Sequence, residues 1–333
     1  MIETIKSSKI KDLRKNLKML TSFKKDVDSG LSKHIKTLPS KYFYNKIGDA
    51  LFVEIMNLPE YYLTRSEFNI FQNKTQELID SFQIKKDNYF ELIELGAGDG
   101  LKTKELLKEL DSQNFNFDYF PIDISNNALN LLKNDLKSVL PNLSVKTKQG
   151  DYFEVLASLK ENNNPKVILF LGSNIGNMND DKAAEFIYNL GANLKPRDKL
   201  LLGVDLIKSK DIVLPAYNDN KGVTAKFNLN LLQRINDELE ANFNLNHFIH
   251  APEYNELEGI AKSYIVSTTQ QNVYIKAIEK SFSFDKGEKI HTEISRKYND
   301  TIIKKIIGNT DFNIETKILD SKAYFADYIL KRN

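Results

Sequence analysis

Three glycines at alternating positions form the first segment of this sequence that could hold a small molecule. They lie in the segment ELGAGDG at 94–100, between an expected strand and an expected helix. A glycine loop lets the backbone approach a ligand closely, although glycines also occur in ordinary turns. The dinucleotide-binding pattern G-x-G-x-x-G would need a third glycine where this sequence has Leu101. The loop therefore departs from pyrophosphate binding, and Lys102 on the next helical turn is placed to bind an amino-acid carboxylate.

Two acidic residues follow the next two expected strands. Asp123 ends such a strand, where a carboxylate can accept hydrogen bonds from both ribose hydroxyls or can cap a helix. Asp151 could accept a hydrogen bond from an adenine amino group while Tyr152 packs on the ring, and a surface turn is the alternative. The glycine loop and the two acids, in this order, predict S-adenosylmethionine (SAM) as the ligand. The residues expected to contact SAM are Gly96, Lys102, Asp123, Asp151 and Tyr152.

A fourth loop, LGSNIGN at 171–177, follows another apolar strand. Two glycines and two asparagines at such a position suit a polar pocket for the molecule that would accept a group from SAM. An Asn-Gly loop with left-handed residues is an equally good reading of the spacing.

The elements around these loops alternate strand with helix. Strands are expected at 89–95, 118–124, 143–147, 167–171 and 200–205. Helices are expected at 64–82, 102–110, 127–140 and 180–190, the first of them opened by a capping box at Thr64-Arg65-Ser66-Glu67. This order predicts parallel βαβ units in a doubly wound, Rossmann-like α/β sheet.

The alternation of expected strands and helices ends at about residue 206, which indicates a second, smaller α+β domain. A helix is expected at 223–240, a long strand at 273–283, and a hairpin turn at Asp285-Lys286-Gly287. Two further strands, at 314–318 and 324–330, are expected to return to the main sheet. The predicted SAM-binding domain is therefore 64–206 with 296–333, and the predicted substrate-binding domain is 1–63 with 207–295.

Composition restricts the kinds of protein this chain can be. Its 333 residues contain no cysteine, which excludes disulfides, thiolate-bound zinc and thiol catalysis. The net charge of +2 gives no overall attraction to nucleic acid or acidic lipid, and the four histidines form no convincing metal-ligand spacing. The apolar runs are too short to span a bilayer, and the amino-terminal segment has no signal-peptide character. We therefore expect a cytoplasmic protein without nucleic-acid, membrane or metal partners, and leave its oligomeric state open, a monomer included.

Taken together, the motifs resemble the histidine-specific, SAM-dependent Nα-methyltransferases of ergothioneine biosynthesis. The segments that carry the resemblance are YFY at 42–44, LPEYYLTR at 58–65, ELGAGDGLKT at 94–103, FPIDIS at 120–125, GDYFE at 150–154, LFLGSNIGN at 169–177, LLGVDLIK at 201–208, AYNDNKGVTAKFNLNLLQRIN at 216–236 and HTEIS at 291–295. They follow one another along nearly the whole chain. The Pro-Glu-Tyr-Tyr segment, Phe227-Asn228 and Arg234-Ile235-Asn236 are distinctive of this family rather than of methyltransferases in general.

The resemblance implies an enzyme that trimethylates the α-amino group of L-histidine, forming hercynine and three molecules of S-adenosylhomocysteine. It implies that Tyr61, Asn177 and Tyr217 hold the amino-acid end of the substrate. Glu293 and Ser295 would hold the imidazole, and Tyr44 would line the pocket near the amine as the catalytic residue.

Three other functions are compatible with parts of the pattern. A relative could methylate another amino acid or amine, and a non-catalytic protein could bind SAM as a sensor. A nicotinamide-dependent oxidoreductase is disfavoured by Leu101. Retention of the complete acceptor set argues against a non-catalytic role. A carboxylate with a hydroxyl two residues away on one strand suits an imidazole with two ring nitrogens, although without the resemblance a cross-strand surface pair is the favoured reading of Glu293 and Ser295.

Overall fold

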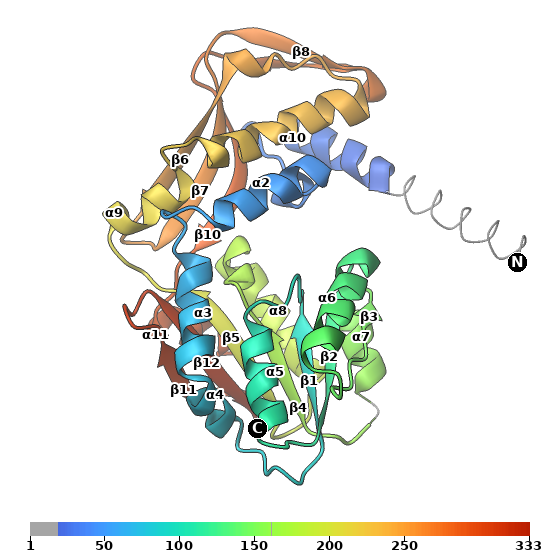
Figure 1. The fold of residues 1–333 in the computed structure, drawn as a ribbon. Coiled ribbons are helices and arrows are strands. Elements are labelled where there is room, and N and C mark those ends of the chain that lie inside the picture. The colour runs from blue at the N-terminus through green and yellow to red at the C-terminus, as the bar shows by residue number, and fades with distance from the viewer. Residues whose placement is uncertain (1–18, 161) are drawn as a thin grey trace, which may run out of the picture. The chain divides into compact units, whose positions relative to one another are not determined.

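A seven-stranded sheet forms the core of the larger of two units in the computed structural model, which describes residues 19–160 and 162–333 (Figure 1). This large unit comprises Tyr62–Lys208 and Ser295–Asn333. The small unit comprises Ser209–Ile294 and the residues up to Tyr61. The chain thus passes between units at 61/62, 208/209 and 294/295, each within two residues of a boundary expected from the sequence.

The large sheet is parallel except at one edge. Its strand order is β11-β12-β5-β4-β1-β2-β3, and β11 and β12 run antiparallel to their neighbours. The strands are β1 (Phe90–Leu95), β2 (Phe117–Asp123), β3 (Lys148–Gln149), β4 (Lys166–Phe170), β5 (Lys199–Asp205), β11 (Phe312–Leu319) and β12 (Phe325–Arg332). The chain order reverses between β1 and β4, which is the point where ligands bind in open α/β sheets. The predicted doubly wound sheet and the return of two late strands to it are confirmed.

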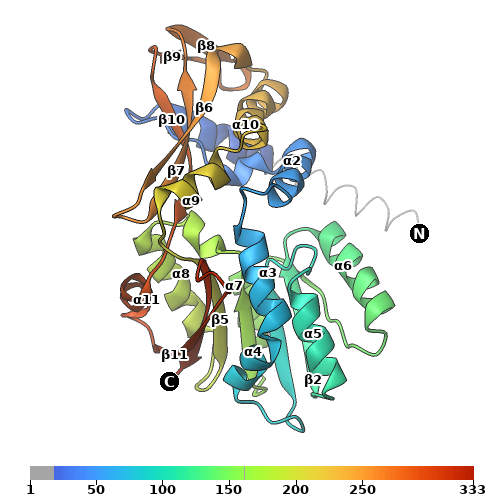
Figure 2. The same ribbon diagram turned by 60° about the vertical axis from the view of Figure 1, so that its left-hand side comes forward.

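Helices cover both faces of this sheet (Figure 2). One face carries α3 (Leu63–Asn73), α4 (Thr75–Phe82), α5 (Thr103–Ser112) and α6 (Asn126–Val139). The other face carries α7 (Tyr152–Leu159), α8 (Asp180–Ala192) and α11 (Asp300–Ile307), and a short 3-10 helix, η2 (Asn174–Asn177), follows β4. Successive residues of a strand point to opposite faces, so Ile93 packs with α8 whereas Leu92 packs with α5. This double burial explains why the strands read as continuous apolar runs.

Three local predictions in the large unit are wrong. The helix expected at 64–82 is broken between α3 and α4 at Lys74, and the strand expected at 143–147 makes a single bridge, Tyr119 to Val145, before β3 begins. The capping box does not form, because α3 already begins at Leu63 and its first turn has no side-chain cap. Glu67 is fully buried instead, since it has partners elsewhere in the unit.

The small unit consists of short helices packed on antiparallel strands. Its sheets are β10-β7-β6 and the hairpin β8-β9, formed by β6 (Phe248–Asn255), β7 (Ile260–Ser267), β8 (Gln271–Ile275), β9 (Lys280–Phe284) and β10 (Lys289–Arg296). Its helices are a segment at 19–31, η1 (Ser40–Phe43), α2 (Lys46–Met56), α9 (Lys210–Val213), η3 (Leu214–Tyr217), α10 (Val223–Leu239), η4 (Leu245–His247) and η5 (Lys276–Ile278). The longest of them, α10, buries Leu231, Leu232 and Ile235 in the core of this unit.

Two strand predictions in the small unit are wrong. The strand expected at 273–283 is two strands, because Glu279 adopts a left-handed conformation (φ 55°) that reverses the chain between β8 and β9. The turn at Asp285-Lys286-Gly287 does not close a hairpin, since β9 and β10 belong to different sheets.

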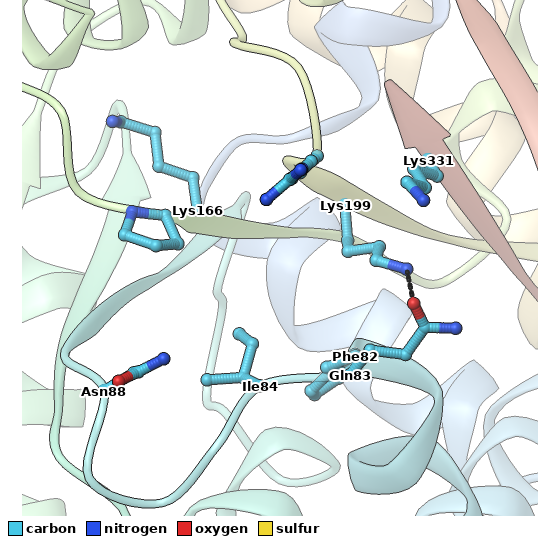
Figure 3. Close-up of a pocket in the computed structure, with 9 residues that line it drawn as sticks. Phe82, Gln83, Ile84, Asn88, Lys166, Lys199 and Lys331 are labelled. Atoms are coloured by element: carbon cyan, nitrogen blue, oxygen red, sulfur yellow. Dashed lines mark hydrogen bonds between the residues drawn. The ribbon is translucent and has the colours of Figure 1, made fainter. Parts of the chain in front are cut away.

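A hollow of about 460 Å³ lies at the amino-terminal edge of the large sheet (Figure 3). Lys166 and Lys199, the first residues of β4 and β5, line it together with Arg197 and Lys331. The two strand-initial lysines are almost completely buried and pair with Glu91 and Glu315, so their charge is balanced inside the protein. This hollow is at the opposite edge from the predicted cofactor loops, which follow the carboxyl ends of the strands.

Candidate active site

The glycine loop begins at the end of β1, as predicted. Gly96 donates a backbone hydrogen bond to the carbonyl of Ile122 on β2 (2.9 Å) and has a φ of +73°. A Cβ placed on Gly96 would lie 2.7 Å from the hydroxyl oxygen of Tyr152. Glycine is therefore required both for the backbone angle and for the close approach of a side chain from the start of α7.

The two acids lie at neighbouring strand ends. Asp123 is the last residue of β2, and its carbonyl accepts a hydrogen bond from Gly150 N (3.2 Å), which brings Asp151 and Tyr152 beside it. Asp123 Oδ1 accepts from Ser125 N (2.8 Å), and its other carboxylate oxygen has no partner among the described residues. Asp151 caps α7 by accepting from Phe153 N (2.9 Å). Both acids thus hold the local turns as well as presenting carboxylate oxygens at this edge.

Tyr152 connects these elements electrostatically. Burial and the nearby charges of Asp123 and Asp151 raise the pKa of Tyr152 to about 12. The hydroxyl is therefore neutral at physiological pH and can donate a hydrogen bond. Gly96, Asp123, Asp151 and Tyr152 lie together at the carboxyl edge of the sheet, as the order of motifs predicted.

Lys102 immediately precedes α5 and forms an ion pair with Glu67 of α3. Its ammonium also lies near the loop after β4, since a Cβ on Gly172 would be 3.7 Å from Lys102 Nζ. Lys102 therefore lies between the glycine loop and the loop that carries Asn177, which is exposed at the end of η2. Its contact with SAM remains a prediction.

The predicted acceptor residues are divided between the units. Tyr44, Tyr61, Tyr217 and Glu293 belong to the small unit, whereas Asn177 and Ser295 belong to the large unit. Glu293 and Ser295 both lie on β10, two residues apart, and their shared contact with one substrate stays a prediction. Ser295 Oγ accepts a hydrogen bond from Lys297 Nζ (2.9 Å).

Tyr44 belongs to an aromatic cluster in the small unit. The Tyr44 ring packs edge-on against Phe52 (5.7 Å) and Phe227 (5.8 Å), and Phe52 also contacts Tyr61 (6.3 Å). Burial, with a further contribution from the charge of Glu293, raises the pKa of Tyr44 well above its usual value. The Tyr44 hydroxyl therefore stays protonated at neutral pH, and the Glu293 carboxylate is close enough to influence it.

Two polar residues of α10 hold the segments next to Tyr44 and Glu293, a role that the sequence did not predict. Arg234 of α10 donates to the carbonyls of Tyr42 (3.0 Å) and Tyr44 (3.1 Å). Asn228, six residues earlier on α10, accepts from Thr292 beside Glu293 (3.0 Å). The family-distinctive residues of α10 thus fix the segments that carry two predicted site residues.

Asp205 holds a second network in the large unit. It is fully buried at the end of β5 and binds the Tyr62 hydroxyl (2.8 Å), Lys208 Nζ (2.5 Å) and Lys297 Nζ (2.8 Å). These three partners lie at or near the points where the chain enters or leaves this unit. No signal in the sequence distinguishes Asp205 from any other acid that ends a strand.

A family model described as "Histidine-specific methyltransferase, SAM-dependent" matches residues 23–332. The chain belongs to this family. It is 34% identical to a "Histidine N-alpha-methyltransferase" of Mycobacterium tuberculosis, over 83% of this chain and 84% of that protein. It is 30% identical to "Ergothioneine biosynthesis protein 1" of Schizosaccharomyces pombe, over 89% of this chain and 39% of that protein. A "4-dimethylallyltryptophan N-methyltransferase" of Epichloe festucae var. lolii is 24% identical over 92% of this chain and 93% of its own length.

The carboxyl edge of the large sheet in this methyltransferase fits the SAM that its family requires. Among the described residues, no atom lies within 4 Å of a Cβ on Gly98, only Tyr152 atoms lie within 4 Å of a Cβ on Gly96, and Asp123 presents a carboxylate oxygen. Within residues 19–160 and 162–333, no group of three or more histidine, aspartate or glutamate side chains could hold a metal ion. No helix in the same part of the chain is long and apolar enough to cross a membrane.

Replacing Gly96 by alanine should weaken binding of S-adenosylhomocysteine roughly tenfold or more, because the new Cβ would collide with the Tyr152 hydroxyl. Gly98→Ala is the matched control, since Gly98 has a similar backbone angle (φ +56°) but no atom within 4 Å of a Cβ. Isothermal titration calorimetry should show a clearly smaller loss for Gly98→Ala. Equal losses would indicate that backbone strain alone is responsible.

Glu94, at the end of β1, should make the stability of this methyltransferase depend on pH. Burial raises its pKa from 4.5 to about 7, although hydrogen bonds from Tyr119 and Thr103 oppose the shift. The folded protein then holds a proton that the unfolded chain releases between these values, so stability is lost as pH rises from about 5 to 7. Urea unfolding at pH 5 and pH 8 should show a loss of about 3 kcal/mol that is absent in Glu94→Gln. An identical pH dependence in both proteins would contradict this assignment.

Proposed function

We propose that this methyltransferase transfers three methyl groups from SAM to the α-amino group of L-histidine and so forms hercynine. The observation that carries the proposal is the pairing of an acceptor-only carboxylate, Glu293, with the aromatic cluster around Tyr44 in a member of the histidine-specific family. A carboxylate there can accept a hydrogen bond from an imidazole N–H. The aromatic faces suit an amine that becomes a quaternary ammonium.

The large unit would hold SAM by the residues at the carboxyl edge of its sheet. Asp123 would accept hydrogen bonds from the ribose hydroxyls, and Asp151 from the adenine amino group. Tyr152 would pack on the adenine ring, and Lys102 would bind the aminoacyl carboxylate. SAM supplies a methyl group on a sulfonium centre, and its product is S-adenosylhomocysteine.

The acceptor residues would hold histidine by its two polar ends. We assign Asn177, Tyr61 and Tyr217 to the amino-acid end, since an amide and phenol hydroxyls can donate to a carboxylate. Glu293 and Ser295 would serve the two imidazole nitrogens. A site that pairs both nitrogens discriminates against apolar side chains, because its polar groups would otherwise be left unpaired.

Chemically, each transfer forms a nitrogen–carbon bond with the amine lone pair and breaks the sulfur–carbon bond of SAM. The amine must lose a proton before each attack, so three protons leave in the conversion of the α-ammonium group to a trimethylammonium group. The neutral hydroxyl of Tyr44 is suited to orient the amine through its oxygen lone pair, not to act as a phenolate base. Alignment of nitrogen, methyl and sulfur then supplies most of the acceleration.

Incubation of the purified protein with SAM and L-histidine should give a product heavier by three methyl groups, together with three equivalents of S-adenosylhomocysteine. Mass spectrometry of a time course would also reveal mono- and dimethylated intermediates. Asp123→Asn, which removes a carboxylate oxygen from the cofactor edge, should lower activity through the KM for SAM. Absence of turnover, or a reaction that stops after one methyl group, would refute trimethylation.

The relative that is named for 4-dimethylallyltryptophan favours one second candidate, N-methylation of a different amino acid. Glu293→Ala separates the two possibilities. If histidine is the substrate, its KM should rise roughly tenfold or more while kcat changes less. Glu253→Ala is the control, because Glu253 is an exposed acid of the same unit whose ion pair with Lys289 lies at the surface. If Glu293→Ala leaves the KM for histidine unchanged while another amino acid is turned over faster, the second candidate stands.

A further inference from the structure

Glu67 is a fully buried acid on α3, and the sequence predicted only a capping-box role for it. Both of its carboxylate oxygens lie 2.9 Å from the backbone nitrogen of Gly172, which donates to them. Its Oε2 also pairs with the ammonium of Lys102. Glu67 thus accepts from one backbone amide and one ammonium, and these two partners balance a carboxylate that is buried away from solvent.

The two partners of Glu67 come from different loops. Lys102 follows the glycine loop after β1, and Gly172 begins the loop after β4 that ends at Asn177. The strands β1 and β4 are paired neighbours, with Leu92 beside Val167, so the two loops start at adjacent positions on the sheet edge. Glu67 therefore connects the loop predicted to bind SAM with the loop predicted to bind the acceptor.

A second buried acid, Asp327 of β12, lies beside Glu67. Its carboxyl oxygens have no hydrogen-bond partner among the described residues, and burial together with the charge of Glu67 raises its pKa well above the usual range. A Cβ on Gly203 would lie 2.1 Å from Glu67 Oε1 and 3.0 Å from Asp327 Oδ1, so glycine at this point of β5 leaves room for both carboxyl groups. With Asp327 neutral, a single negative charge, that of Glu67, faces the Lys102 ammonium.

Lys102 is largely buried as well, with 19% of its side chain exposed. An ammonium has three N–H donors, and its contact with Glu67 leaves donors for a second anion. Without Glu67, a flexible four-carbon side chain would have no fixed direction and the Gly172 amide would lose its acceptor. The Glu67 side chain thus forms both the ion pair with Lys102 and the hydrogen bond with the Gly172 amide.

We propose that Glu67 is a positioning residue for methyl transfer, which sets the Lys102 ammonium for the aminoacyl carboxylate of SAM and fixes the acceptor loop through Gly172. The inference rests on the proposed role of Lys102 in SAM binding. Glu67 acts through Lys102 and Gly172, so its effect should depend on Lys102 being present.

A double-mutant cycle tests this dependence with the full chain and S-adenosylhomocysteine as the calorimetric probe. Glu67→Gln should weaken binding roughly tenfold in the wild-type background and less than about threefold in a Lys102→Met background. Equal losses in both backgrounds, or no loss in the wild-type background, would overturn the inference. If Lys102→Met binds S-adenosylhomocysteine like the wild type, the proposed role of Lys102 in SAM binding fails, and this inference fails with it. The assay with SAM and L-histidine tests the proposed methylation independently of that result.

Three further variants distinguish positioning from a general structural role. Asp327→Asn, which replaces one neutral group by another, should change SAM affinity less than about twofold, whereas a loss like that of Glu67→Gln would overturn the neutral assignment. Glu77→Gln, on an exposed position of α4, is the surface control.

If Glu67→Gln does not fold, as judged by its melting temperature, Glu67→Asp keeps the charge but retracts it by one methylene. Glu67→Asp should then raise the KM for SAM with a smaller change in kcat, and an unchanged KM would refute the proposal.

Discussion

The parallel pairing of β1 with β2 on one side and with β4 on the other is the constraint on which the remaining structure depends. Parallel strands bring their carboxyl ends to one edge, and the reversal of chain order between β1 and β4 keeps the crossover helices away from that point. The glycine loop, Asp123 and the turn at Asp151 therefore meet although they are far apart in sequence. The strands tolerate this arrangement because both of their faces are buried by helices.

Buried charge then organises the loops that leave this edge. Glu67 and Asp205 are both fully buried, and each is surrounded by lysine ammonium or backbone donors from segments distant in sequence. An ionised group in such a place is tolerated only when it is paired and hydrogen-bonded, so the positions of its partners are tightly restricted. Glu67 restricts the loops after β1 and β4, and Asp205 restricts residues next to the unit boundaries.

The small unit fixes its site residues in a different way. Arg234 and Asn228 of α10 contact backbone or side-chain atoms next to Tyr44 and Glu293. The rings of Phe52 and Phe227 pack against the ring of Tyr44. The apolar face of such a helix packs in the core, and its polar side chains can form hydrogen bonds to neighbouring loops and strands. Residues that distinguish the family from other methyltransferases thus have structural roles close to the predicted acceptor residues.

The order of strands and helices in the large unit and the cofactor motifs could be predicted from the sequence, because apolar runs and glycine loops reflect local rules of burial and backbone geometry. The family followed from motifs spread along the chain. Two predictions were wrong. The capping box at Thr64 does not form, and Glu67 instead accepts from Gly172 in the loop after β4. The strand expected at 273–283 is two strands, because Glu279 adopts a left-handed conformation. Tertiary structure alone decided that Glu67, Asp205 and Asp327 are buried and which groups face them, because the partners of a buried charge are set by long-range packing that no local pattern encodes.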